Sequence, residues 1–581
     1  MLDGEAERAA AGTDFVTRRG LPAAVARVTS ADQAAALLGY ASERGVPVSP
    51  RGAGTNLCGG FWPGPESVVL DMSSMTRILS LDLDRRLATI EPGLINGDLQ
   101  TALARHGLCF SPDPASAGIS TIGGNIIENA GGPGCIKHGV TFHHVAAIEV
   151  ALAGGSLARF GEGDRVDLLG VMIGSEGILG VLTEATLKLR PLPDKTWTAL
   201  AAFARLEDAV AIVSELVAAA ISPAALELCD RRQVNLCEDW LPSGYPRDAE
   251  AILFVELDGD PDEVSAGASV LEPVLRRQDP GLRVATDATD RARLWAGRLA
   301  AAHAFKATGK EFYVCDVTVP RQRIPEMVIA ARRIAAGLDL DVATVAHAGD
   351  GNVHPVILYT PDESERMREG AGAIAAAALE LGGTLTGEHG IGTEKVQHMR
   401  ARFGAAEVAA FRAVKGVFDP AGILNPGVLL PPLGADEPRL PVFTAAVAAA
   451  VAGERPQAGG GGAGLAGIEV DADSLVVNAG GSETCAEVAA ALHDRGLESA
   501  ALPSSGTISE LVEDLGGTGG PRACLLMVEA ELRDGPVVTF GSAAVKDVAG
   551  LDLKRLVAGG GGAFGRVRRA SFKVGPTPPV D

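Results

Sequence analysis

Cysteine is scarce in this sequence, and no two cysteines stand in a metal-binding pair. The chain has no Cys-x-x-Cys spacing, which zinc ribbons and most iron–sulfur proteins need, so we expect no cluster bound by this chain alone. Spacing does not exclude disulfides, but an intracellular location favours free thiols. The eight cysteines are Cys58, Cys109, Cys135, Cys229, Cys237, Cys315, Cys485 and Cys524.

An excess of basic charge and long hydrophobic runs are also missing. The formal net charge is −22, so nucleic acid is excluded as a partner, because phosphate neutralisation requires a basic face. No stretch reaches the roughly eighteen uncharged apolar residues that suggest a membrane span. The N-terminal "MLDGEAERAAAGTDF" is acidic and polar, unlike a secretory signal. We expect a cytoplasmic protein, with peripheral association at the inner face of the membrane still open.

The length of the chain and its alternation of apolar runs predict several domains. A chain of 581 residues is too long for one hydrophobic core. Residues 15–193 alternate short strand-like and helical runs, and residues 194–430 alternate longer ones. Residues 431–467 are rich in Pro, Ala and Gly, which is typical of a linker. We predict an α+β fold in which a further domain, residues 468–581, follows this linker.

The last segment repeats part of the first. "VDLLGVMIGSEGILGVLTEATLKLRPLP" (166–193) aligns without gaps on "LDLKRLVAGGGGAFGRVRRASFKVGPTP" (551–578), and "TALARHGL" (101–108) lines up with "AALHDRGL" (490–497). Glycine matches alone are weak in a Gly-rich chain, but a Lys-x-x-Pro closes both long segments at the same spacing. The pattern predicts a partial duplication.

Two glycine-rich loops follow apolar runs in the first domain. "SPRGAGTNLCGG" (49–60) is neither a Walker loop nor a G-x-G-x-x-G fingerprint. Its small residues would let backbone N–H groups approach an anion, as in nests that hold pyrophosphate, and Arg51 would add positive charge; a simple turn is the alternative. "PDPASAGISTIGGNIIENAGGPG" (112–134) is too apolar at intervals for a disordered linker.

Three of the ten histidines gather in two Gly-punctuated loops. His347 and His354 bracket "HAGDGNVH", and His389 follows Glu388 in "TGEHGIG". Two imidazoles and a carboxylate are usual ligands of a zinc-like ion in a catalytic site. Histidines satisfied in a core are one alternative. A zinc hydrolase with His389 as its base is another, but it leaves both glycine-rich loops unexplained.

Taken in chain order, these motifs resemble a known family. The two loops, "GSEGILGVLTEATLKL" (174–189), "HAGDGNVH", "GEHGIG" and "FDPAGILNPG" resemble the FAD-linked oxidases among the vanillyl-alcohol oxidase and p-cresol methylhydroxylase (PCMH) flavoproteins. They are most similar to the group with the glycolate oxidase D subunit and the D-lactate and D-2-hydroxyglutarate dehydrogenases, over roughly residues 15–430. The resemblance implies a PCMH-type FAD-binding domain of two α/β subdomains and a ferredoxin-like α+β cap domain that carries the substrate and metal site.

The resemblance also implies which residues bind FAD. Some relatives attach FAD covalently, but no histidine lies in residues 50–60, so we expect non-covalent FAD. The residues expected to hold it are Arg51, Gly52, Ala53, Gly54, Thr55, Asn56, Ser116, Thr121, Gly124, Asn125, Asn129, Gly131, Gly177, Val181 and Asn425.

The implied reaction is the oxidation of a small D-2-hydroxy acid to the 2-oxo acid. A divalent metal, expected to be zinc, would be held by His347, His354 and Glu388 and would lower the pKa of the substrate hydroxyl. His389 would accept the hydroxyl proton as general base, while hydride passes from Cα to flavin N5. Asn352 is a candidate to contact substrate or flavin, and a polar turn residue is its alternative.

Arg298 is the expected partner of the substrate carboxylate, because a guanidinium fits a carboxylate. It lies in "RLWAGR", which resembles the family's Trp-x-x-Arg segment. Relatives that act on 2-hydroxyglutarate carry a Lys near "YVCD" (313–316), where this chain has Val314 and Cys315, so glycolate or D-lactate is favoured over a D-2-hydroxyglutarate-type activity. The resemblance favours a separate iron–sulfur subunit as electron acceptor, and we expect a homo-oligomer.

The C-terminal segment carries a resemblance of its own. "GSAAVKDVAGLDLKRL" (541–556) resembles the glycolate oxidase E subunit, which implies that residues 468–581 are a truncated E-type copy of the FAD-binding domain. This copy has no counterpart of "RGAGTN", so we expect it to bind no FAD and to pack on the first half as a built-in partner. One alternative is that residues 468–581 are a degenerate remnant with little role. Another is that the whole chain is a non-catalytic flavoprotein scaffold.

Overall fold

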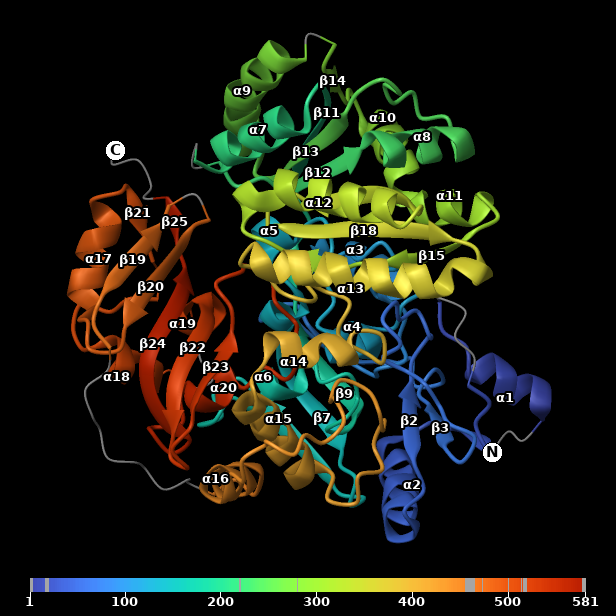
Figure 1. Cartoon of the computed structure of the whole chain (residues 1–581), viewed down its shortest axis with the longest axis vertical. Helices are drawn as coiled ribbons and strands as arrows, with labels where there is room; N and C mark the ends of the chain where they lie inside the picture. Colours follow the sequence, from blue (N-terminus) through green and yellow to red (C-terminus); the bar gives the residue numbers. More distant parts are fainter. Residues whose placement is uncertain are drawn as a thin grey trace.

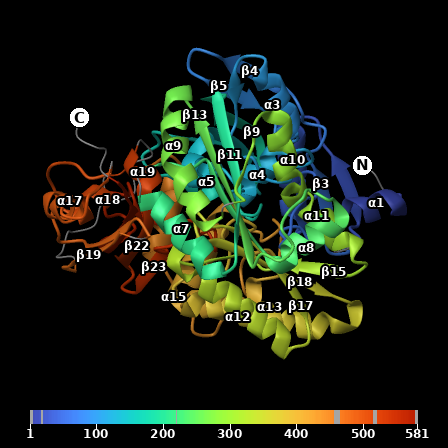
Figure 2. The same cartoon turned by 90° about the horizontal axis from the view of Figure 1, so that it is seen from above.

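Three structural parts meet around a common centre (Figure 1). In the computed structural model, the first domain lies at the lower right, the cap above it and the C-terminal copy at the left, and Figure 2 shows the copy at the same side when the molecule is seen from above. The fold is α+β, as predicted. The structure describes residues 4–15, 20–218, 221–279, 281–454, 465–472, 474–499, 501–513, 515 and 520–576.

The first domain contains two sheets. A parallel three-stranded sheet, β1-β3-β2, packs against α2, and an antiparallel five-stranded sheet has the order β4-β5-β9-β7-β8. The strands are β1 (Ala24–Arg27), β2 (Val48–Arg51), β3 (Val68–Asp71), β4 (Ile78–Asp82), β5 (Leu87–Ile90), β7 (Val145–Ala151), β8 (Leu157–Gly161) and β9 (Val181–Lys188), with the short pair β6 (Leu108–Cys109) and β10 (Arg190–Pro191). The helices are α1 (Glu5–Ala11), α2 (Ala31–Arg44), α3 (Asn96–Ala104), α4 (Ile122–Glu128), α5 (Cys135–His138), η1 (Thr141–His144) and α6 (Leu168–Met172).

The cap is an antiparallel sheet of eight strands, some long and some short, with helices on both faces. Its order is β14-β11-β13-β12-β17-β18-β15, and β16 pairs with β18. The strands are β11 (Lys195–Phe203), β12 (Ala225–Asp230), β13 (Ala251–Gly259), β14 (Arg283–Val284), β15 (Glu311–Val314), β16 (Val317–Thr318), β17 (Asp341–His347) and β18 (Asn352–Tyr359). One face packs on α7 (Leu206–Ala218), α9 (Pro261–Gln278), α12 (Ile324–Gly337) and α13 (Ser364–Glu380), and the other on α8 (Arg231–Trp240), α10 (Ala288–Leu299) and α11 (Ala301–Ala307).

After the cap, the chain returns to the first domain. α15 (Ala405–Phe418) packs in the core of that domain, and Leu424 forms a parallel bridge with Val48 of β2. α14 (Met399–Arg402) and three 3-10 turns, η2 (Arg321–Arg323), η3 (Pro361–Glu363) and η4 (Val396–His398), complete this region.

The predicted linker is only partly a linker. Residues 441–451 form α16 (Pro441–Val451), whose Phe443 and Val447 are fully buried, because the Ala-rich run carries an apolar face that packs on α15. That part of the linker prediction is therefore wrong. Residues 455–464 of the predicted linker lie outside the described residues.

The strand order of the C-terminal copy repeats that of the first domain, in line with the predicted duplication. Its sheet, β19-β20-β24-β22-β23, repeats the order β4-β5-β9-β7-β8, and the pair β21-β25 repeats β6-β10. The elements are β19 (Ile468–Asp471), β20 (Val476–Gly480), β21 (Leu497–Glu498), β22 (Leu525–Leu532), β23 (Val537–Gly541), β24 (Gly565–Lys573), β25 (Gly575–Pro576), α17 (Cys485–His493), α18 (Ile508–Glu513), α19 (Gly520–Cys524) and α20 (Lys554–Val557). Within the described part of the copy, no sheet corresponds to β1-β3-β2.

Backbone conformation repeats as well. Gly174 and Gly177 have φ angles of 76° and 70°, and their counterparts Gly559 and Gly562 have 77° and 73°. Glu176 has φ 51° in the left-handed region that side chains avoid, and Gly at the equivalent position has φ 55°. The first copy therefore keeps a carboxylate at a position where backbone conformation favours glycine, which points to a local function for Glu176.

The copy packs on the first domain through a continuous core. One hydrophobic cluster contains Leu187 of the first domain, Phe411 of α15 and Phe572 of the copy. At its edge, Arg522 of the copy donates two hydrogen bonds, of 2.6 and 2.9 Å, to Asp167 of the first domain. This burial is why the copy belongs to the folded body of the protein.

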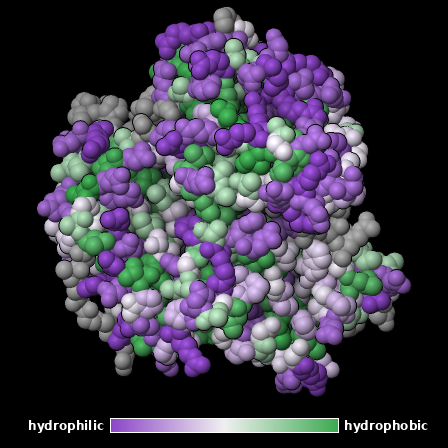
Figure 3. Space-filling view, viewed as in Figure 1, coloured by the Kyte–Doolittle hydropathy of each residue, from purple (hydrophilic) through white to green (hydrophobic). Residues whose placement is uncertain are grey.

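The surface that faces the reader in Figure 3 mixes small hydrophobic areas with hydrophilic ones, and hydrophilic side chains cover most of the cap. No helix among the described residues is long and apolar enough to cross a membrane.

Replacing Phe443 by Ala tests whether α16 is packed structure. The variant is expected to lose about 3–5 kcal/mol of unfolding free energy, because a fully buried ring is removed from the core. Denaturant unfolding of F443A and of the control V442A, whose side chain is 40% exposed, measures this difference. Equal midpoints for the two variants would contradict a packed α16.

Candidate active site

A cavity of about 420 Å³ lies between the first domain and the cap. Its walls come from both glycine-rich loops and from the 388–389 turn. The cap contributes strands β15, β17 and β18, through residues such as Val314, Val345 and Val356. Motifs that are more than 300 residues apart in the chain, such as Thr55 and His389, therefore share one chamber.

The loop after β2 presents unused backbone donors to the cavity. Among the described residues, no hydrogen bond uses the backbone amides of residues 53–56. Arg51 lines the same wall, where its Nη1 donates to the carbonyl of Gly52 at 3.1 Å and its buried Nε has no hydrogen-bond partner. Free amides beside a guanidinium suit an anion such as a pyrophosphate.

Glycines keep the cavity open. A Cβ at Gly54 would lie 2.5 Å from Nη2 of Arg51, and Gly54 also has φ 71°. A Cβ at Gly52 would collide with Thr121, and one at Gly131 would collide with Glu388. The close approach of these loops requires glycine, and a chamber lined by glycines and free amides suits a dinucleotide such as FAD.

Nearly all residues predicted to hold FAD line this cavity. Asn425 has φ 44°, and its Nδ2 donates to the carbonyls of Gly60 and Glu176, which leaves a buried Oδ1 without a partner. The cavity-lining set is Arg51, Gly52, Ala53, Gly54, Thr55, Asn56, Ser116, Thr121, Gly124, Asn125, Gly131, Gly177, Val181 and Asn425.

Asn129 is the exception. It is not among the lining residues: it ends α4 with φ 53°, and its Oδ1 accepts a hydrogen bond from the backbone of Phe142 at 2.9 Å. The Oδ1 atom of Asn129 is engaged in the turn after α4, so the FAD contact that the resemblance implies for this residue stays a prediction.

The three expected metal ligands converge at the cavity wall. Glu388 Oε1 lies 3.2 Å from Nε2 of His347 and 3.4 Å from Nε2 of His354. These ligand atoms all lie within 4.8 Å of one another, and all three residues line the cavity. The donor set of two imidazole nitrogens and one carboxylate oxygen suits zinc, so the residues fit a divalent metal.

Sheet register explains why the two histidines meet. His354 of β18 is opposite Val345 of β17, two residues before His347, so both imidazoles lie on the same face. Glu227 of β12 is paired directly with His347 and accepts a hydrogen bond from its Nδ1. A carboxylate behind a ligating imidazole fixes the orientation of the ring, as metal sites commonly require.

Charges alternate along this part of the site. Arg298 donates to Glu227 through Nε at 3.1 Å and Nη2 at 2.8 Å. Burial alone would raise the pKa of Glu227, but His347 and Arg298 hold it below its usual range. Burial would lower the pKa of His347, but Glu227 and Glu388 raise it to about 10. Glu227 and Glu388 thus stabilise a positive charge at His347, which lies between them.

The second oxygen of Glu388 has a different partner. Lys546, which belongs to the C-terminal copy, places its Nζ 2.5 Å from Oε2. Burial would raise the pKa of Glu388, but Lys546 and His347 keep it well below its usual range. The carboxylate is therefore charged, with one oxygen toward the imidazoles and the other toward an ammonium group.

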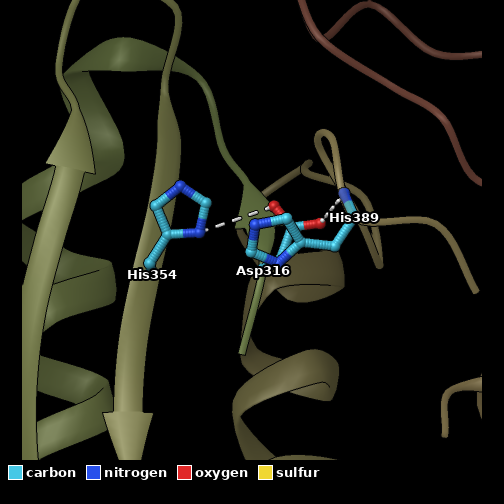
Figure 4. Close-up of side chains that lie close together, drawn as sticks. All are labelled: Asp316, His354 and His389. Atoms are coloured by element: carbon cyan, nitrogen blue, oxygen red, sulfur yellow. Dashed lines mark hydrogen bonds and ion pairs between the residues drawn. The ribbon is translucent and has the colours of Figure 1, made fainter. Parts of the chain in front are cut away.

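A buried aspartate shapes the turn that carries Glu388 and His389. Figure 4 shows Asp316 between His354 and His389. Asp316 Oδ2 accepts hydrogen bonds from the backbone amides of Gly387, Glu388 and His389 at 3.1, 3.2 and 2.9 Å. Three amides on one carboxylate hold this turn in place, so Asp316 orients both functional side chains without lining the cavity.

Asn352 does not reach the cavity. Its Nδ2 donates to Asp316 Oδ1 at 2.8 Å and to the carbonyl of Val317 at 3.1 Å, and its side chain is fully buried. The Asp316 carboxylate and the Val317 carbonyl thus engage the Nδ2 of Asn352 behind the turn, and the predicted contact of Asn352 with substrate or flavin stays a prediction.

His389 lines the cavity beside the ligand set. Its ring stacks on that of His354 with centroids 5.0 Å apart, and its Nε2 lies 3.6 Å from Glu388 Oε1. Its buried Nδ1 has no hydrogen-bond partner. An imidazole with one uncommitted nitrogen at the cavity wall can accept a proton from a ligand.

Glu176 links this turn to the first domain. Its carboxylate accepts hydrogen bonds from the backbone amides of Ile391 at 2.7 Å and Gly392 at 2.6 Å. This contact accounts for the left-handed backbone conformation of Glu176. The two hydrogen bonds offset the backbone strain and hold the turn that follows His389 against the first domain.

Sequence reasoning missed Glu227, Asp316, Glu176 and Lys546. A lone acidic residue inside an apolar strand, as in "ALELCD" and "YVCDVTV", is a usable signal for the first two. No local signal marks Lys546, which lies 158 residues from its partner.

Replacing Gly54 by Val is expected to abolish FAD binding. The side chain would be strained at φ 71° and would meet the Arg51 guanidinium in the cavity wall. The ratio of visible flavin absorbance to protein absorbance in the purified variant measures the loss. The control G64A, at a position on the same connection with open space, should keep FAD; a yellow G54V protein would contradict this placement of the cofactor.

Two family models match the chain. The model for the FAD binding domain matches residues 22–161, and the model for the C-terminal domain of FAD linked oxidases matches residues 192–429. The C-terminal copy lies beyond both.

Characterised proteins are similar over the same region. Glycolate oxidase subunit GlcD of Escherichia coli K12 is 41% identical over 413 residues, which covers 69% of this chain and 82% of that protein. GlcD of Bacillus subtilis is 38% identical (70% and 89% covered), and D-lactate dehydrogenase of Anaerostipes hadrus is 33% identical (70% and 89%).

Solved structures agree in fold. p-Cresol methylhydroxylase is 17% identical with a TM-score of 0.58 and covers 73% of this chain and 93% of its own. Alkyldihydroxyacetonephosphate synthase is also 17% identical with a TM-score of 0.58, covering 70% and 76%.

Proposed function

Since this chain belongs to the FAD-linked oxidases, we propose that it oxidises a small D-2-hydroxy acid, glycolate or D-lactate, to the 2-oxo acid. The observation that carries the proposal is the meeting of His347, His354, Glu388 and His389 in the wall of a cavity whose other walls are the glycine-rich loops. GlcD and D-lactate dehydrogenase, the similar proteins, are named for these two substrates.

The cofactors are FAD, bound without a covalent link, and a divalent metal, for which zinc fits best. Cys58 and Cys135 are buried, and neither lines the cavity, so neither thiol is placed to attach the flavin. When bound, FAD accepts the hydride from the substrate Cα, and the metal lowers the pKa of the substrate hydroxyl.

Residues of this chain supply binding and proton transfer. Arg298 lines the cavity, and Glu227 fixes its Nε and Nη2, so that Nη1 is the nitrogen left to bind a substrate carboxylate. His389 accepts the hydroxyl proton, and Glu388 and Asp316 hold its ring and backbone in position. Positioned general bases contribute about 10²–10⁴ in rate.

The cavity favours a small monocarboxylate. Arg51 and Arg298 are the only Arg or Lys side chains among the described residues that line it, and Arg51 belongs to the anion-binding loop. Beside Arg298, the wall consists of Phe312, Val314 and Val356, which offer no second cation to a dicarboxylate. This supports glycolate or D-lactate over 2-hydroxyglutarate.

Electrons must leave the reduced flavin to an acceptor outside this chain. All eight cysteines are free and dispersed, so a separate iron–sulfur electron-transfer subunit is the acceptor we propose. We also propose a cytoplasmic location, where free thiols such as these persist.

Anaerobic mixing with substrate tests the proposed activity. The purified protein should be yellow, and glycolate or D-lactate should bleach its visible flavin band, faster than 2-hydroxyglutarate does; prior treatment with a strong chelator should slow the bleaching. A yellow protein that stays unbleached with every hydroxy acid, or a colourless protein, would contradict the proposal.

Replacing His389 by Asn should slow flavin reduction by about 10²–10⁴, because the general base is lost. Stopped-flow absorbance at saturating substrate measures this rate. The control H398N changes a histidine outside the cavity lining and should reduce flavin at the wild-type rate. If H389N reduces flavin at a rate within a few-fold of wild type, a group other than His389 accepts the proton of the substrate hydroxyl.

A further inference from the structure

The C-terminal copy reaches into the active site through one loop. In the first domain the connection from β8 to α6 is short, residues 162–167, whereas the equivalent connection of the copy, from β23 to α20, spans residues 542–553. The longer loop carries Lys546.

This loop follows the segment that carries Glu388. Asp547 Oδ1 accepts a hydrogen bond from Thr384 Oγ1 at 2.9 Å, and the backbone amide of Val548 donates to the carbonyl of Thr386 at 3.2 Å. These contacts on neighbouring residues place Lys546 beside Glu388 in a defined register rather than by a single flexible side chain.

Lys546 is buried almost completely. Its side chain is 2% exposed, and its Nζ lies 2.5 Å from Glu388 Oε2 and 3.6 Å from Asp350 Oδ2. An ammonium group withdrawn from water is tolerated only with such partners, and either carboxylate would be left uncompensated without it. Asp350 lies in the loop between the two histidine ligands, so Lys546 touches both segments of the metal site.

The first domain makes room for this ammonium group. A Cβ at Gly131 would lie 2.7 Å from both Cε and Nζ of Lys546. Gly131 lines the cavity, whereas Lys546 does not, so the lysine lies behind the cavity wall and does not face the substrate. Its effect must pass through Glu388.

We propose that Lys546 is a positioning residue of the metal site, which the C-terminal copy supplies to the enzyme formed by the first domain and the cap. Lys546 holds Oε2, so that Oε1 stays directed between the Nε2 atoms of His347 and His354. The copy, whose described residues form no counterpart of the sheet β1-β3-β2, thereby contributes to the site without binding FAD. This inference rests on the metal of the proposed function.

Zinc affinity of the metal-stripped full-length protein tests the proposal. Zinc is titrated against a chromophoric chelator for wild type, K546M, K546R and the control D547N. K546M should bind zinc about 10–100-fold more weakly, as is usual when a residue that orients a metal ligand is lost. K546R should recover most of the affinity, since it restores a cationic donor. Flavin absorbance should be unchanged in all four proteins.

The D547N control distinguishes the effect of losing the ammonium group from the effect of disturbing the loop. D547N keeps the acceptor for Thr384 and leaves Glu388 untouched, so its zinc affinity should equal that of wild type. Wild-type affinity in K546M, tighter binding, or equal losses in K546M and D547N would overturn the role of Lys546 while the proposed function stands. A wild-type protein that binds no zinc would overturn the metal site itself.

A second variant covers the case in which K546M does not fold. The double variant K546M/D350N removes one negative charge with the positive one, so that the buried charge stays balanced. It should bind zinc about 10–100-fold more weakly than D350N alone, because only the double variant lacks the donor to Glu388. Equal affinities in these two proteins would overturn the proposal.

Discussion

The buried carboxylate of Glu388 joins parts of the chain that are far apart in sequence. One of its oxygens faces the imidazoles of His347 and His354 in the cap, and the other faces Lys546 of the C-terminal copy. A charge buried this deeply is stable only when each oxygen has a partner. This one side chain therefore connects the cap, the copy and the glycine-rich wall around Gly131 at the candidate site.

Around this centre, each structural part has a separate task. The first domain offers free amides and glycines, which suit a long, negatively charged cofactor. The cap sheet sets Glu227, His347 and His354 on one face through its antiparallel register, and Asp316 holds the turn with three backbone amides. The two imidazole donors are thus positioned by strands β17 and β18, and the guanidinium by helix α10. Glu388 and His389 lie in a turn that Asp316 holds in place, while the wall expected to face the cofactor is formed by loops.

Much of this arrangement could be predicted from the sequence. The candidate metal ligands His347, His354 and Glu388 are predicted from two imidazoles that bracket a tight turn, and from the resemblance to the FAD-linked oxidases. The duplication stands out because glycines that share the left-handed conformation recur at one spacing, as at Gly174 and Gly559. Both signals are local, and both depend on backbone geometry that few residues can adopt.

The rest depends on tertiary contacts. Glu227 acts on His347 only because β12 pairs with β17, and Lys546 acts on Glu388 only because a remote loop lies along residues 384–386. Asn352 and Asn129 have the composition of ligand-binding loop residues, but their amides serve the backbone and a neighbouring carboxylate. Which partner an amide finds is decided by packing, so a sequence pattern cannot separate these roles.

Anomalous diffraction at the zinc edge, from crystals of the full-length protein grown with FAD and zinc, tests the central claim most directly. We expect one strong peak within bonding distance of Nε2 of His347, Nε2 of His354 and Oε1 of Glu388, with Lys546 still bound to Oε2. The absence of a peak there, or a metal bound elsewhere while these side chains keep their mutual hydrogen bonds, would contradict it.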